Sequence, residues 1–117
     1  MAKKPPDPFV AACLARLQPL GPVRVRAMFG GHGFFLDDRM FALIAWERLY
    51  FKADGETEAR FRSAGGEPFV YEGKGKPMQM GYWWVPVDPD ADYDGWLGFA
   101  QAGVDAAERA AAKKRKR

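Results

Sequence analysis

Apolar positions near the start of the chain recur at the spacing of a helix and then give way to a run of strands. Asp7 can cap a helix whose apolar positions share one face: Phe9, Cys13, Leu14 and Leu17. Pro19 and Gly21 end this helix. From residue 23 onward the period shortens to two, which is typical of half-buried strands.

Four strands are predicted over residues 23–29, 34–36, 40–45 and 49–52. The turns between them are too short for parallel crossovers, which need a dozen residues or more, so the strands should pair as antiparallel hairpins. The stretch 40–45 is apolar on both faces, which predicts a central strand. Glycines at 30, 31 and 33 should end the first strand and connect it to the second.

The second half continues with a helix, two strands and a long final helix. Asp54 or Thr57 can cap the middle helix, and strands follow over 68–72 and 78–85. The last helix, about 93–113, should bury one stripe: Trp96, Leu97, Ala100, Val104, Ala107 and Ala111. Gly98 and Gly103 each cost it about 1 kcal/mol relative to Ala, and close packing against the sheet would explain them.

These elements predict an α+β domain in the order α-β4-α-β2-α. It should have two layers, an antiparallel sheet of about six strands with three helices on one face. A chain of 117 residues fits a single domain. We place that domain at 8–112, between a loose leader at 1–7 and a basic tail at 113–117.

Charge changes the picture only at the end of the chain. Five of the 18 basic residues form the tail: Lys113, Lys114, Arg115, Lys116 and Arg117. The remaining 13 face 15 acidic residues, so the body is slightly acidic. A basic tail attracts polyanions without sequence specificity.

Cys13 is the only cysteine, so no internal disulfide can form and a reducing compartment is indicated. No signal peptide is visible, and no stretch approaches the ~18 apolar residues of a membrane helix. We therefore expect a cytoplasmic protein that makes no membrane contact.

The segment RAMFGGHGF at 26–34 resembles the signature of the TfoX N-terminal domain family. Further segments agree in order: MFAL at 40–43, LYFK at 49–52, PFVY at 68–71 and MGYWWVP at 80–86. The resemblance implies a small antiparallel α/β fold without established catalytic residues. Full-length members regulate DNA-uptake competence through transcription and carry a second, C-terminal domain.

Two turns depart from the Asp-Gly pairs that are usual in this family. They read Asp37-Asp38 and Trp46-Glu47. Glutamate adopts a left-handed backbone poorly, so we expect the second turn to differ in shape from the first.

Four features suggest chemistry, and each has a simpler interpretation. The glycines at 30–33 could cradle an anion, but a strand follows where a dinucleotide site needs a helix. Residues 73–76 resemble a phosphate loop only superficially, and a basic hairpin tip is favoured. His32 could act as a general base, although no nucleophile lies near it in sequence. Residues 88–94 lack the glycine and glutamate of a calcium loop. With a simpler interpretation available for all four features, we expect no metal, cofactor or catalytic residue.

The strand over 78–85 is apolar on both faces near its end, so its outer side needs a cover. Cations and rings should share that side: Arg24, Arg26, Tyr50, Lys52, Tyr82 and Trp84. We favour a regulatory module that binds a protein partner or a second copy of itself, as a possible homodimer, through these residues.

Two alternatives stay open. One is a weak nucleic-acid binder that uses the sheet face with Lys74, Lys76 and the tail residues Lys113–Arg117. The other is a small enzyme built around His32 and the glycines.

Overall fold

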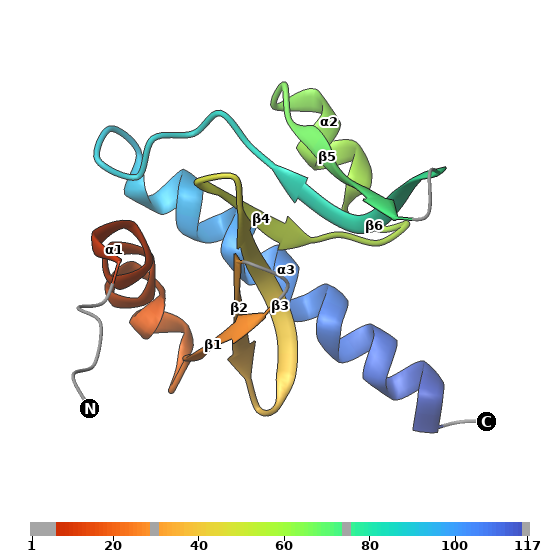
Figure 1. The fold of residues 1–117 in the computed structure, drawn as a ribbon. Helices are drawn as coiled ribbons and strands as arrows, with labels where there is room; N and C mark the ends of the chain where they lie inside the picture. The colour runs from red at the N-terminus through yellow and green to blue at the C-terminus, as the bar shows by residue number, and fades with distance from the viewer. Residues whose placement is uncertain (1–6, 29–30, 74–75, 116–117) are drawn as a thin grey trace.

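A computed structural model describes residues 7–28, 31–73 and 76–115 of the chain. Over these residues one antiparallel sheet carries its helices on one face (Figure 1), which confirms the predicted α+β class. The helices are α1 (Pro8–Leu17), the short 3-10 helix η1 (Gln18–Leu20), α2 (Glu58–Ser63) and α3 (Tyr93–Arg115). The strands are β1 (Arg24–Met28), β2 (Gly31–Leu36), β3 (Arg39–Ala45), β4 (Arg48–Lys52), β5 (Glu67–Gly73) and β6 (Lys76–Trp84).

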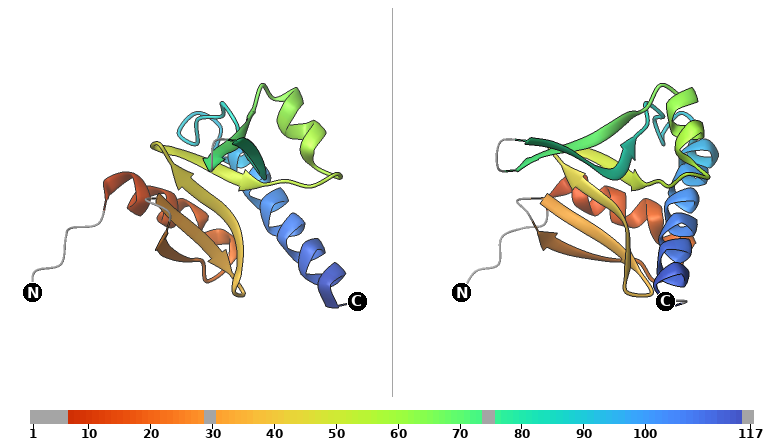
Figure 2. Two further views of the ribbon diagram at one scale, coloured as in Figure 1. Left: turned by 45° about the vertical axis from the view of Figure 1, so that its right-hand side comes forward. Right: turned by 90° about the vertical axis from the view of Figure 1, so that its right-hand side faces the viewer.

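The strands lie in the order β1-β2-β3-β4-β6-β5, and all neighbours are antiparallel. The doubly apolar β3 occupies a central position, as predicted. The register shifts between Phe34 and Phe35 and again between Pro68 and Val70. Such irregularities bend strands, and Figure 2 shows β1–β3 and the β5–β6 hairpin as two wings of a strongly bent sheet.

Both two-residue hairpin turns have a left-handed backbone at their two central positions. The φ angles are 54° and 62° at Asp37 and Asp38, and 52° and 60° at Trp46 and Glu47. The expected difference in shape between the turns is therefore wrong. Both turns therefore have the type I′ shape, which matches the twist of the flanking strands and requires a positive φ at both central residues; this requirement overrides the poor preference of tryptophan and glutamate.

Gly31 and Gly33 lie inside β2, so the prediction that they connect the first two strands is wrong at these two positions. A Cβ on Gly31 would stand 2.1 Å from the carbonyl oxygen of Ile44 on β3. Glycine is thus required here for β2 and β3 to pair closely, which supports its interpretation as a structural residue.

The main core fills the space between the helices and one face of the sheet. α1 contributes Val10, Cys13 and Leu17, whereas Phe9 is 36% exposed and does not belong to the buried face that we predicted. The Asp7 side chain caps α1 by accepting a hydrogen bond from the Phe9 N–H at 2.8 Å. The sheet contributes its inward side chains: Phe34, Phe41, Ala42, Ile44, Leu49, Phe51, Trp83 and Val85 lie in this core.

α3 crosses the sheet and buries most of the predicted stripe: Trp96, Ala100, Val104 and Ala107. Leu97 and Ala111 are only half-buried. A Cβ on Gly103 would lie 2.8 Å from the carbonyl oxygen of Phe41, whereas one on Gly98 would meet nothing within 4 Å. Close packing therefore explains Gly103 and leaves Gly98 unexplained.

Candidate protein-interaction face

The sheet side that faces away from α3 carries all six residues predicted for partner binding. Residues directly opposite one another on neighbouring strands share a face. Arg24 lies opposite Phe35, and Phe35 opposite Met40. A second row runs through Arg26, Gly33, Leu43 and Tyr50, and a third joins Lys52 to Tyr82. We call this side the outer face; it also includes Ala45, Arg48, Phe69 and Trp84.

A small second core occupies part of the outer face. Tyr50 and Tyr82 are 3% and 7% exposed and pack with Phe69, whose ring centroid lies 5.0 Å from that of Tyr50. The Tyr82 hydroxyl donates to the carbonyl oxygen of Met40 at 3.4 Å, and burial raises the pKa of Tyr82 to about 12. These two rings are thus already covered within the chain, and a partner would meet their neighbours instead.

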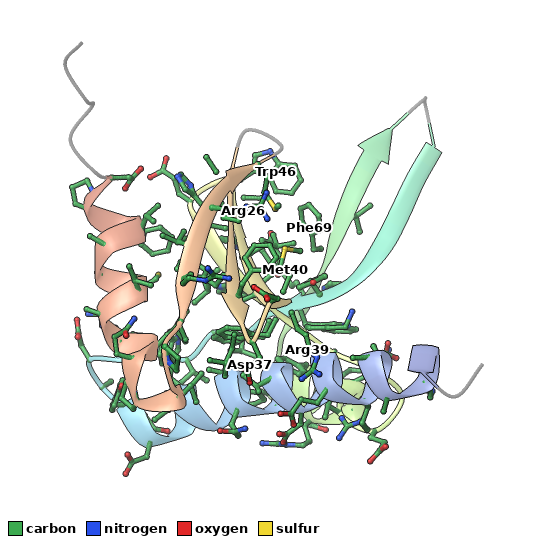
Figure 3. The ribbon with its side chains drawn as sticks, turned by 90° about the horizontal axis from the view of Figure 1, so that it is seen from below. Arg26, Asp37, Arg39, Met40, Trp46 and Phe69 are labelled. Atoms are coloured by element: carbon green, nitrogen blue, oxygen red, sulfur yellow. The ribbon has the colours of Figure 1, made fainter. Side chains whose placement is uncertain are left out.

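The exposed part of the outer face centres on Trp46, which sequence reasoning did not single out. Its side chain stands at the tip of the β3–β4 hairpin, is 69% exposed and lies 5.3 Å from the ring of Phe69. Figure 3 shows Trp46 with Arg26, Met40 and Phe69 between the central strands and the β5–β6 hairpin. The signal in the sequence was a tryptophan at a turn position that favours asparagine, aspartate or glycine.

Most of the cations on this face already have partners. Arg24 forms an ion pair with Asp38. Arg48, which was also missed, pairs with Glu67 at 2.8 Å and stacks 3.8 Å from the ring centre of Trp84. The hydrogen bond that Arg48 donates to the Glu67 carboxylate raises the pKa of its guanidinium. Arg26 lies over the Phe35 ring at 5.5 Å, and Lys52 over Tyr82 at 5.2 Å. The face therefore mixes rings with two cations that are paired with carboxylates, Arg24 and Arg48, and two that lie over rings, Arg26 and Lys52.

Of the residues predicted for nucleic-acid contact, Lys113 is the one whose side chain the structure describes. Lys74, Lys116 and Arg117 lie outside the described residues. Lys76 begins β6, and Lys113, Lys114 and Arg115 end α3, where Lys113 is exposed; the other three side chains are outside the description.

His32 and the acidic segment before α3, which were the other candidates for a chemical role, occupy positions that secondary structure explains. His32 sits in β2 between Ala27 and Ile44 and is half-buried. In the acidic segment before α3, Asp88 accepts from the Asp90 N–H at 2.9 Å, and Asp92 from the Gly95 N–H at 3.0 Å. The described part of the chain contains no group of three or more His, Cys, Asp and Glu side chains that could hold a metal ion. Among those same residues, no helix is long and apolar enough to cross a membrane.

Comparison with known proteins agrees with the resemblance noted in the sequence. The model of the TfoX N-terminal domain matches residues 15–107. The chain is also similar to the DNA transformation protein TfoX1 of Aliivibrio fischeri (strain ATCC 700601 / ES114), with 46% identity over 52 residues. That match covers 44% of this chain and 25% of the relative, so it spans only about a quarter of the relative's length.

Proposed function

The chain belongs to the TfoX N-terminal domain family, and on that premise we propose that it is a non-catalytic regulatory module linked to DNA transformation. We propose further that it acts as a homodimer whose subunits meet through the outer face. The regulatory part is supported by the name of the relative TfoX1. The dimer is supported by the environment of one side chain, Trp46.

Trp46 combines exposure with backbone strain. It leaves 69% of its surface exposed and holds φ at 52°. A left-handed conformation costs a residue other than glycine roughly 1–2 kcal/mol, and an exposed tryptophan gains little stability by burial. Interface hot spots are enriched in tryptophan and lie in contacts that exclude water. The cost is understandable if Trp46 is buried against a partner.

The charge pattern of the outer face suits a second copy of the same surface. A two-fold interface brings identical patches together, so each patch must complement itself. On the outer face, Arg24 and Arg48 are matched within the chain by Asp38 and Glu67, and Arg26 and Lys52 lie over the rings of Phe35 and Tyr82. A surface that mixes rings, paired charges and cations able to contact rings complements a second copy of itself.

The test of the dimer is the solution mass of the full chain over a range of concentrations. We expect a monomer–dimer equilibrium that Trp46→Ser weakens at least tenfold. Phe9→Ser is the matched control, because Phe9 is the other exposed large apolar residue among those described and belongs to α1, whereas Trp46 stands at the tip of the β3–β4 hairpin. A chain that stays monomeric, or a dimer that tolerates Trp46→Ser but not Phe9→Ser, would contradict the proposed interface.

The regulatory role is tested in the host bacterium. We expect deletion of the gene to change the frequency of DNA transformation severalfold, and an allele with Trp46→Ser to reproduce that change. A deletion without any effect on transformation would remove the regulatory role and leave the dimer untouched.

A further inference from the structure

A cavity of about 260 Å³ lies where the core side of the sheet meets the outer face: Leu49, Phe51 and Trp96 of the core line it together with Arg48 and Trp84 of the outer face, whereas Trp46 does not. Its walls come from α1, β4, the end of β6, the 85–89 segment and the start of α3. In Figure 1 these elements meet where α1 approaches the loop that leads into α3. The cavity is open to solvent on the side of Phe9, which is 36% exposed, and has the volume of about eight or nine waters at ~30 Å³ each.

Rings and apolar side chains supply most of the lining residues, and Arg16, Arg48 and Asp88 add charged groups. Trp84 and Trp96 line the cavity together with Phe51 and Phe9, and the Cys13 thiol also faces it. Phe9 is the ring that α1 leaves partly exposed. Ring faces and edges pair preferentially with other flat rings, so the shape and chemistry of the walls favour a small aromatic molecule.

The charged groups at the cavity are already satisfied. Arg16 donates to Asp90 at 2.8 Å, and Arg48 donates to Glu67 at 2.8 Å. Asp88, the acidic residue of the lining, accepts the backbone N–H of Asp90. An anionic ligand would have to displace Asp90 or Glu67 from its arginine and would also meet the Asp88 carboxylate, which favours an uncharged ligand over an anion.

The same contacts hold the cavity in shape. The Arg16–Asp90 pair joins α1 to the loop before α3. The Tyr93 hydroxyl donates to the carbonyl oxygen of Arg16 at 2.5 Å and fixes α1 against the start of α3. Ligand sites in proteins are usually preformed in this way, with apolar walls and few polar groups.

We propose that this cavity is a binding site for a small, uncharged aromatic molecule of one or two rings. The site shares Arg48 and Trp84 with the outer face but does not include Trp46, on which the proposed dimer depends. It would give the domain a means of sensing a metabolite or signal of that chemical class.

The probe is 2-naphthol, titrated calorimetrically into the full chain, with 2-naphthoate as its charged counterpart. We expect saturable binding of one equivalent of 2-naphthol, and at least tenfold weaker binding of 2-naphthoate. Bound 2-naphthol should also slow the alkylation of Cys13 by N-ethylmaleimide, because the thiol lines the cavity.

Two variants locate the site. Cys13→Leu adds volume inside the cavity and should weaken 2-naphthol binding at least tenfold. Phe9→Ala removes a wall at a partly exposed position and should also weaken it, which keeps the test decisive if Cys13→Leu fails to fold. Trp46→Ser, on the outer face, should leave the affinity unchanged. Absence of saturable binding, tighter binding of 2-naphthoate, or loss of binding in Trp46→Ser alone would overturn the proposal.

Discussion

Two glycines of α3 differ in whether the structure requires them. Gly103 lets the helix approach the backbone of β3, because any Cβ there would clash with the Phe41 carbonyl. Gly98 faces open space and only weakens the helix.

We predict opposite effects for the two alanine substitutions. Gly98→Ala should raise the free energy of unfolding by up to about 1 kcal/mol, the usual difference in helix propensity. Gly103→Ala should lower it by about 1–3 kcal/mol, because forcing extra volume into a packed site strains the structure. Urea unfolding of both variants measures this, and a stabilising Gly103→Ala would contradict the packing described for α3.

The buried thiol of Cys13 makes the free energy of unfolding depend on pH. Burial raises the pKa of Cys13 to about 11, above the value of about 8.5 expected in the unfolded chain. The unfolded state therefore loses its proton first as the pH rises. The stability that the neutral thiol contributes is fully present below pH ~8.5 and is lost as the pH rises toward 11.

We therefore predict that the stability difference between the natural chain and Cys13→Ala shrinks with pH. Between pH 8 and pH 10 the difference should fall by about 2 kcal/mol, at 1.36 kcal/mol per unit of pKa difference. Chemical denaturation of both proteins at each pH provides the measurement, and the alanine variant cancels the titration of all other groups. A constant difference would mean that the thiol is not protected from solvent.

At the scale of elements, the turn of the β3–β4 hairpin carries residues that destabilise the turn itself but would stabilise the proposed dimer. Its turn places tryptophan and glutamate where asparagine and glycine are favoured. The ion pair between Arg109 and Asp54, by contrast, stabilises the fold of the single chain. Arg109 of α3 donates to both carboxylate oxygens of Asp54 at 2.7 and 2.9 Å, which lowers the pKa of Asp54 and fixes α3 to the loop before α2.

Replacing the turn by Trp46→Asn and Glu47→Gly should stabilise the fold by about 1 kcal/mol, because both positions then accept a positive φ. The same double variant should weaken the dimer at least tenfold, since it removes the exposed ring. Thermal unfolding and the solution mass report the two effects separately. Asp37→Asn is the matched control, because it relieves a left-handed position in the other hairpin and should leave the dimer intact.

At the scale of the whole molecule, the distribution of charge decides how the chain meets a polyanion. The body holds 13 basic and 15 acidic residues, and five further cations lie at the end. Five described arginines, Arg16, Arg24, Arg48, Arg62 and Arg109, are paired with carboxylates, whereas Arg26 and Arg60 lie over the rings of Phe35 and Phe99. Because the tail concentrates five cations on a body with more acidic than basic residues, we expect it to supply most of any affinity for nucleic acid.

We predict that the full chain binds labelled duplex DNA only weakly and only at low salt. Replacing Lys113–Arg117 by glutamine should abolish this binding, because phosphate contacts supply essentially all of a non-specific affinity and release counterions. Fluorescence anisotropy at about 20 and 200 mM salt measures the effect. Unchanged affinity in the tail variant would place the DNA contacts on the folded body instead.

The order and type of the elements follow from the sequence alone, because local periods and short turns leave few alternatives. The central position of β3 and the shared outer face of Arg24, Arg26, Tyr50, Lys52, Tyr82 and Trp84 follow from strand alternation. The predicted last helix, about 93–113, lies within two residues of α3 (Tyr93–Arg115), because the helical period of its apolar positions is also local.

Only the tertiary structure decided which of these residues a partner or ligand could reach. Phe69 comes from a distant strand and covers Tyr50 and Tyr82, while Trp46 is left exposed. The cavity exists because α1, β6 and the start of α3 converge from opposite ends of the chain. Local patterns record which face a side chain occupies, but burial and cavities depend on what distant segments place against that face.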